Sequence, residues 1–292
     1  MTTLMRNVHA SVAYTIVAAM VSVAAACSSQ PVLAQPSLDA VPASAADSAP
    51  AGVHPCDNTL VRLDPHTVWY FGEMQPVAPE LLRETLTTHD SRLVVTSTGG
   101  RSTAAISLLA EVERANLTLV VRQLCASACA HFLFVPANRV HVEENAIVAF
   151  HHTSSMALEF SLARGSSLHL DYLQSEAAAE QALYQERRID AGFLYWPGLS
   201  VGFRCAGFYR DGPSDQWTFL TDVTFGIPSR REIEAVKGDA IDGFWPESSH
   251  QVRAAFDLIG GQSATFRFPI SEPEEPYPPS TWANVADCAD AP

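Results

Sequence analysis

Apolar segments alternate with longer segments of helical periodicity between residues 67 and 150, and this alternation restricts the chain to few architectures. The expected strands cover 68–71, 93–97, 117–121 and 147–150. The expected helices between them cover 79–88, 102–115 and 127–135. Strands that are apolar throughout and are separated by helices pair in parallel and are covered by those helices. The sequence therefore predicts an α/β fold.

Small and polar residues follow three of these strands. Gly99-Gly100 ends one strand, Ser127 lies in the segment Leu124-Cys125-Ala126-Ser127-Ala128-Cys129-Ala130 after another, and His151 ends a third. The carboxyl ends of parallel strands meet at one edge of a sheet, where the chemistry of such folds gathers. A serine needs a base to take its proton, and the developing oxyanion needs backbone N–H donors. The order of the three segments therefore indicates a serine acyl-transfer site.

These segments resemble the Clp protease/crotonase superfamily. The residues that carry the resemblance are Gly72, Ser97-Thr98-Gly99-Gly100, Cys125-Ala126-Ser127-Ala128 and Ala149-Phe150-His151. The nearest similarity is to its exported bacterial branch of predicted periplasmic Clp-protease-like proteins, which carries similar Cys-Ala-Ser-Ala-Cys-Ala segments. The resemblance spans 67–152 and continues weakly to Ile227. It implies a β-β-α spiral with mostly parallel stacked sheets and a homo-oligomeric assembly.

The resemblance also implies roles for individual residues. Ser127 matches the nucleophile, His151 the general base, and the backbone amides of Gly99 and Ala128 the oxyanion hole. For the third member of the triad, Asp215 is the leading candidate, because it precedes an apolar segment that is followed by a glycine; Asp190 and Asp211 are the alternatives. An insertion around 194–209 departs from the protease pattern in this region.

His152 competes with His151 for the role of the base. Neighbouring residues on a strand point to opposite faces, so only one of the two is expected to face Ser127. The comparison of motifs selects His151. Structural interpretations stay open beside the catalytic one: Ser127 as a small residue for close helix packing, and Gly99-Gly100 as a simple turn.

Two functions from different classes follow. The first is an exported serine hydrolase, with a peptide or protein substrate, that needs no cofactor or metal. The second is a non-catalytic envelope protein that keeps the fold for binding or assembly. A net charge of −14 argues against a nucleic-acid partner. An acyl-CoA enzyme of the crotonase type ranks third, because the acidic chain has no obvious basic site for the phosphates of coenzyme A.

The N-terminus has the features of an export signal. Arg6 precedes an uncharged, mostly apolar segment over 10–26, which is short for a membrane span. Two cleavage sites compete: an imperfect lipobox that ends at Cys27 and would place a lipid there, and a signal-peptidase site before Gln35. An uncleaved anchor is a third interpretation. The Ser-, Pro- and Ala-rich segment 27–54 is expected to be a disordered tether, and the chain to reside in the periplasm or on an envelope membrane.

The six cysteines indicate an oxidising compartment only in part. Cys56 and Cys288 lie at the two edges of the predicted folded region, where a disulfide would be effective. Cys125 and Cys129 are four residues apart. A metal site and small buried helix residues are the two interpretations of that pair, and the second is favoured because no further ligand pair supports a metal.

The rest of the chain is expected to support the domain over 55–238. The segment 166–188 reads as a helix for packing or subunit contact. From Asp239 onward the chain is acidic and proline-rich, which favours an extended, solvated extension over 239–292. Its aromatic residues predict that part of it packs on the domain; they are Trp245, Phe256, Phe266, Phe268 and Trp282.

Overall fold

The computed structural model describes residues 58–163, 165, 170–196, 206–211, 216–221, 224–262 and 264–270. The predicted signal segment and tether therefore lie outside the described residues. So do several residues singled out above, namely Cys27, Cys56, Cys205, Asp215, Trp282 and Cys288. The pairing of Cys56 with Cys288 stays a prediction.

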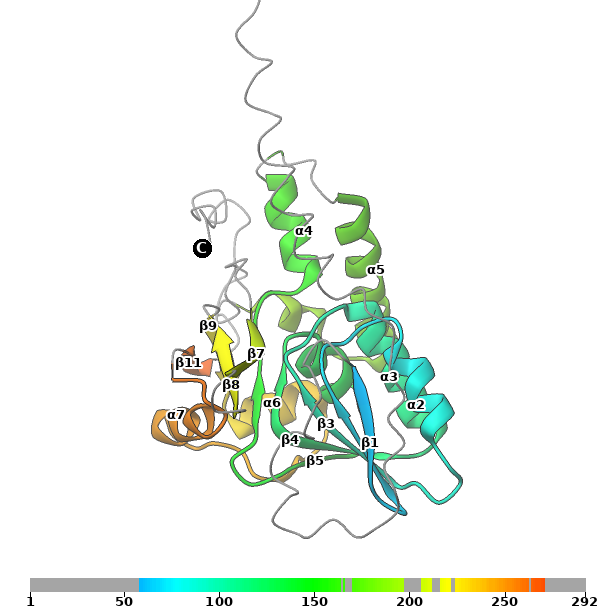
Figure 1. The fold of residues 1–292 in the computed structure, drawn as a ribbon. Helices are drawn as coiled ribbons and strands as arrows, with labels where there is room; N and C mark the ends of the chain where they lie inside the picture. Colours follow the sequence, from blue (N-terminus) through cyan, green and yellow to red (C-terminus); the bar gives the residue numbers. More distant parts are fainter. Residues whose placement is uncertain are drawn as a thin grey trace, which may run out of the picture. The chain divides into compact units, whose positions relative to one another are not determined.

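A seven-stranded, mostly parallel sheet forms the centre of the fold (Figure 1). Its order is β1 (Thr59–Asp64), β2 (Thr67–Phe71), β3 (Arg92–Ser97), β4 (Thr118–Ala126), β5 (Val140–Val142) and β10 (Asp242–Gly243), with β6 (Ile147–Ala149) also paired to β4. Only β1 is antiparallel to its neighbour; the other pairs in this sheet are parallel. The prediction of an α/β fold with a mostly parallel sheet is confirmed.

Strand β4 is longer than predicted and changes partners half-way. Its first half pairs with β5 up to Val121, and its second half pairs with β6 from Leu124. Between the two halves Gln123 has φ of 60°, and the register with β3 shifts. This bend places Ala126 opposite Ala149, so that the end of β4 lies beside the strand that leads to His151.

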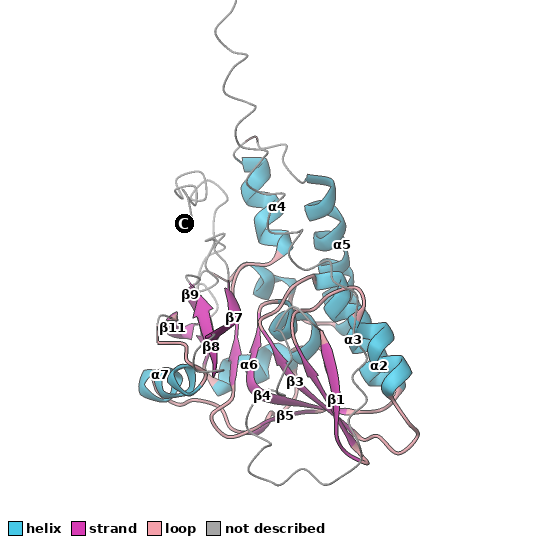
Figure 2. Ribbon diagram, viewed as in Figure 1, coloured by secondary structure: helices cyan, strands magenta, loops and turns pink. Residues whose placement is uncertain are grey.

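Helices cover both sides of the sheet (Figure 2). They are α2 (Ala78–Thr85), α3 (Ser102–Arg114), the π-helix η2 (Cys129–Phe134), α4 (Ser154–Ala163), α5 (Leu170–Arg187), the 3-10 helix η3 (Ala191–Tyr195), α6 (Arg230–Lys237) and α7 (Ser249–Leu258). Leu82 of α2, Leu108 of α3 and Leu133 of η2 are fully buried in one hydrophobic cluster with Val95 and Val121 of the sheet. Helices α4 and α5 pack side by side. No helix in the described ranges is long and apolar enough to cross a membrane.

A smaller layer covers the second face of the sheet. Strands β9 (Thr224–Pro228) and β11 (Thr265–Ile270) pair in parallel, and Phe225 and Phe256 are buried with Trp69. Strands β7 (Ala206–Asp211) and β8 (Gln216–Thr221) form an antiparallel pair. A backbone bridge between Phe150 and Gly226 joins the end of β6 to β9. The chain that leads to His151 is thus fixed from both layers.

The segment from Asp239 is folded as far as Ile270, which corrects the expectation of an extended chain there. It contributes β10, α7 and β11. Trp245 and Phe256 are buried in the core, and Phe266 and Phe268 are partly buried against it. The packing predicted from these aromatic residues is confirmed: their apolar surface outweighs the acidic character of the surrounding sequence.

Candidate active site

Ser127 occupies a sharp turn between β4 and η2. Its φ of 57° lies in the left-handed region, which a residue other than glycine adopts only when its surroundings enforce it. Two hydrogen bonds enforce it here: the Ser127 N–H donates to the Ala149 carbonyl at 3.0 Å, and the Ser127 carbonyl accepts from the His131 N–H at 2.9 Å. A strained strand-to-helix turn of this kind presents a nucleophilic serine in many hydrolases.

A disulfide joins Cys125 and Cys129 across this turn. Both cysteines are fully buried, and their Cα atoms are 5.3 Å apart. The favoured interpretation, small buried helix residues, is confirmed for the burial of both cysteines and for the helical position of Cys129, but Cys125 lies in β4 and neither interpretation anticipated the bond. The reason is the bend at Ser127, which folds the end of β4 back onto the first turn of η2 and brings the two sulfur atoms together. Ser127 is the central residue of the closed loop.

The Cys125–Cys129 bond gives a first prediction. Residues 123–139 contain no lysine or arginine before Arg139, so both cysteines fall in one tryptic peptide. Without reduction this peptide is expected to be lighter by two hydrogens and to resist alkylation. In the chain-entropy model a five-residue loop stabilises the fold by about 2 kcal/mol, so the Cys125→Ala/Cys129→Ala double variant should unfold at lower urea concentration. Alkylation of both thiols in unreduced, unfolded protein would contradict the bond.

Gly99 packs directly against Ser127. Its φ is 104°, and a Cβ atom at this position would lie 2.3 Å from the Ser127 Cβ. The Gly99 N–H donates to the Ser97 hydroxyl at 3.1 Å, so the amide expected in the oxyanion hole has a partner within its own turn. The next residue, Gly100, lines the cavity in front of Ser127. The absence of a side chain at Gly99 therefore leaves the space that the Ser127 side chain occupies.

One cavity of about 220 Å³ brings predicted site residues together. Ser127, Ala128 and His151 line it, together with His131 and His152. Ala128 begins the helical turn of η2, so its N–H has no acceptor within that helix. No aspartate, glutamate, lysine or arginine is among the described residues that line this cavity.

His151 and His152 both face this cavity, contrary to the expected alternation. Strand β6 ends at Ala149, and α4 begins at Ser154, so the two histidines lie in an irregular connection. Their Nδ1 atoms are 3.2 Å apart. Burial, followed by the proximity of His152 and then of His131, lowers the pKa of His151 well below its ordinary value. His151 is therefore neutral at neutral pH, which is the form that accepts a proton.

His131 is a site residue that the sequence did not reveal. Its Nε2 lies 3.0 Å from the His151 carbonyl oxygen, and its own N–H bonds to the Ser127 carbonyl. A carbonyl only accepts, so Nε2 carries the hydrogen and Nδ1 is bare; Nδ1 is buried without a partner in the described part of the chain. Burial lowers the pKa of His131 to about 3. The sequence feature that could have identified His131 is its position four residues after Ser127 in a segment with helical periodicity.

Glu180 of α5 joins the first residues of α3 and α4 through hydrogen bonds. This buried carboxylate accepts from the Ser154 N–H at 2.9 Å, from the Ser155 N–H at 2.7 Å and from the Ser102 hydroxyl at 2.6 Å. It therefore fixes the start of α4, just after His152, against the start of α3, just after Gly100. The packing role predicted for 166–188 is confirmed over the described part, although its buried carboxylates were not anticipated.

The three aspartates proposed for the triad have different outcomes. Asp190 is exposed and caps η3, where it accepts the Gly192 N–H at 2.9 Å. Asp211 lies in β7, of which only the backbone is described, and Asp215 lies outside the described residues. Within the described chain no carboxylate contributes to the pKa shift of His151. Asp215 stays a prediction.

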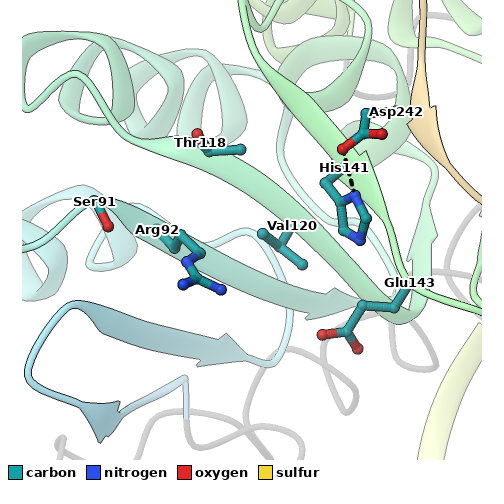
Figure 3. Close-up of a pocket in the computed structure, with 7 residues that line it drawn as sticks. All are labelled: Ser91, Arg92, Thr118, Val120, His141, Glu143 and Asp242. Atoms are coloured by element: carbon teal, nitrogen blue, oxygen red, sulfur yellow. Dashed lines mark hydrogen bonds and ion pairs between the residues drawn. The ribbon is translucent and has the colours of Figure 1, made fainter.

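A second cavity, of about 400 Å³, opens near the amino ends of β3 and β4 (Figure 3). His141 and Asp242 form a hydrogen-bonded pair there, with Nδ1 and Oδ2 2.8 Å apart. Ser91 lies beyond Val120 as seen from this pair (Figure 3). Ser91 is the only serine among the described residues that line this cavity, and it does not lie beside the histidine–aspartate pair (Figure 3). The candidate site is therefore the cavity around Ser127.

No protein-family model and no curated protein matches the chain. Within the described ranges, no group of three or more His, Cys, Asp or Glu side chains is placed to hold a metal ion.

Proposed function

We propose that the chain is an exported serine hydrolase, acting on a peptide or protein, with a fold of the Clp protease/crotonase type. The observation that carries this proposal is that Ser127, in a strained turn closed by a disulfide, lines the same uncharged cavity as a neutral histidine, His151. The small β9–β11 layer on the main sheet supports the proposed fold. A buried disulfide supports an oxidising compartment such as the periplasm.

The proposed reaction is acyl transfer through a covalent intermediate. The Ser127 hydroxyl oxygen attacks the carbonyl carbon of the substrate while its proton passes to His151 Nε2. The Ala128 N–H stabilises the oxyanion, and the bond to the leaving group then breaks as that group takes the proton from His151. Water hydrolyses the Ser127 ester by the same proton route. The low pKa of His151 keeps it ready as a base at neutral pH.

The uncharged lining favours substrates without a charged group next to the scissile bond. An unpaired charge in this cavity would lose its hydration without gaining a counter-ion. The cavity volume of about 220 Å³ lies below the usual range for drug-sized ligands, so only a small part of a peptide would enter it.

A binding protein without catalysis is the second candidate, and one observation favours it. In the described structure the Ser127 hydroxyl has no hydrogen-bond partner, His151 included. Catalytic hydrogen bonds are often loose in ligand-free enzymes and tighten with substrate. The hydrolase is therefore expected to react covalently at Ser127, and the binding protein is not.

A fluorophosphonate probe distinguishes the two candidates. If the chain is a hydrolase, the Ser127 oxygen is expected to displace fluoride from phosphorus and form a stable adduct. An unassisted serine hydroxyl is too weak a nucleophile to do so, and labelling therefore reports a base beside Ser127. Intact-mass measurement should give one adduct per chain, and peptide mapping should place it on Ser127. The Ser127→Ala variant is the matched control. An unlabelled wild-type protein with its disulfide intact would favour the binding protein.

A further inference from the structure

We propose that His152 orients His151, taking the place that a carboxylate holds in most serine triads. The inference rests on the proposed function and names a positioning residue for it. The contact that carries it is the approach of the two Nδ1 atoms to 3.2 Å, with ring centroids 4.6 Å apart.

The chemistry of imidazole makes this contact informative. Two ring nitrogens at hydrogen-bond distance share one hydrogen, so one of them donates and the other accepts. If His151 carries the hydrogen on Nδ1, its Nε2 is bare and can take the Ser127 proton. If His152 donates instead, His151 carries its hydrogen on Nε2 and cannot act as a base there. Catalysis therefore requires His152 to be the acceptor.

Among the described contacts of His151, those of the backbone do not orient its ring, and the contact with His152 does. The backbone is fixed by His131, which donates to the His151 carbonyl, and by two hydrogen bonds between Phe150 and Gly226, of 2.9 and 2.6 Å. The ring itself contacts the edge of the Phe225 ring, with centroids 5.9 Å apart. An aromatic edge contact has little directional preference compared with a hydrogen bond. The Nδ1 contact is thus the directional one.

The charges near His151 distinguish this arrangement from a carboxylate triad. Within the described chain the titratable groups that act on His151 are His131 of η2 and the adjacent His152. Glu180 of α5 is engaged by Ser102, Ser154 and Ser155. A neutral acceptor stabilises an imidazolium less than a carboxylate does, so a histidine partner leaves the pKa of His151 low.

Four variants test the proposal through the rate of Ser127 labelling as a function of pH. His152→Leu removes the acceptor and is expected to slow labelling of folded protein by about 100-fold, the lower end of what general-base assistance contributes. His152→Asn keeps an acceptor oxygen near the Nδ1 position and should restore most of the rate. His152→Asp adds a negative charge and should move the acid limb of the pH profile to higher pH. Asp215→Asn tests the carboxylate that the resemblance implies for this place, and it is expected to slow labelling less than His152→Leu does.

A wild-type rate in His152→Leu would overturn the proposal. If Asp215→Asn then showed a large loss of rate, the role would be assigned to Asp215. Thermal unfolding of each variant ensures that rates are compared for folded protein, because a purely structural role would leave the rate per folded molecule and the pH profile unchanged.

The tautomer of His151 gives a test that does not depend on reactivity. Imidazole ¹⁵N NMR of the wild type and of Ser127→Ala should show His151 with its hydrogen on Nδ1. A hydrogen on Nε2 would contradict the proposal whether or not Ser127 is labelled. If the wild type is not labelled, the proposed hydrolase fails, while the tautomer still decides the role of His152.

Discussion

Gly99→Ala is expected to abolish labelling of Ser127 and to lower the free energy of unfolding by about 2–5 kcal/mol, from overpacking and from the left-handed backbone together. The new Cβ would lie 2.3 Å from the Ser127 Cβ and 2.9 Å from both the Ser127 Oγ and the Ala126 carbonyl oxygen. Ala126 is fully buried in the second core cluster, so the turn has no room to retreat. The φ of 104° adds strain for any residue with a side chain.

Gly238→Ala is the matched control for this prediction. Gly238 also has positive φ, of 80°, at the end of α6, but a Cβ there would meet nothing within 4 Å. Its loss of stability should be about 1 kcal/mol, from the backbone alone, with normal labelling of Ser127. Urea unfolding of both variants measures the difference. Equal stability losses and equal labelling would show that Gly99 does not support the serine.

Mild acid is expected to destabilise the protein through His131. Its pKa is about 3 in the folded state, and an unperturbed histidine has a pKa of about 6.5. Between these values the unfolded chain binds the proton and the folded chain does not, so stability is complete above about pH 6.5 and is lost as pH falls. For this residue, which is 1 % exposed, the loss at pH 5 is about 2 kcal/mol. The depressed pKa of His151 acts with the same sign.

His131→Gln separates this contribution from other titrations. Glutamine keeps an N–H donor for the His151 carbonyl but does not titrate, so its unfolding free energy should fall less between pH 7.5 and pH 5 than that of the wild type. Glu176 and Asp90 have lowered pKa values, and their contributions are lost only at pH values around and below about 4.5. Urea unfolding at the two pH values measures the effect. An identical fall in both proteins would exclude His131 as its source.

The sequence predicted the parts of the fold that rest on local pattern. Strands β2 and β3 and helix α3 lie where their apolar residues placed them, because these segments are buried in a regular way. The second half of β4 was missed, since Arg122 and Gln123 read as the end of a strand and only pairing with β6 extends it. Helix α4 was missed because three serines and a glutamate are interspersed among its apolar residues, so that it shows no helical stripe.

In the candidate site, too, the sequence predicted the features that have a local pattern and missed those that depend on contacts between distant segments. Ser127 and His151 were predicted to meet because the carboxyl ends of parallel strands share one edge, and both line one cavity. The position of His131 four residues after Ser127 was a local signal, but its contact with His151 and the contacts of Glu180 join segments far apart in the chain, which no local pattern marks. The Cys125–Cys129 bond depends on the bend at Ser127, which a helical reading of 127–135 excludes.

The central claim is that His151 activates Ser127, and the rate of fluorophosphonate labelling tests it most directly. The measurement compares wild type with His151→Ala at neutral pH, under conditions in which both are folded and the Cys125–Cys129 bond is intact. General-base assistance contributes on the order of 10²–10⁴-fold, so the variant should label slower by about that factor. Labelling of both proteins at the same rate, or of neither, would contradict the claim.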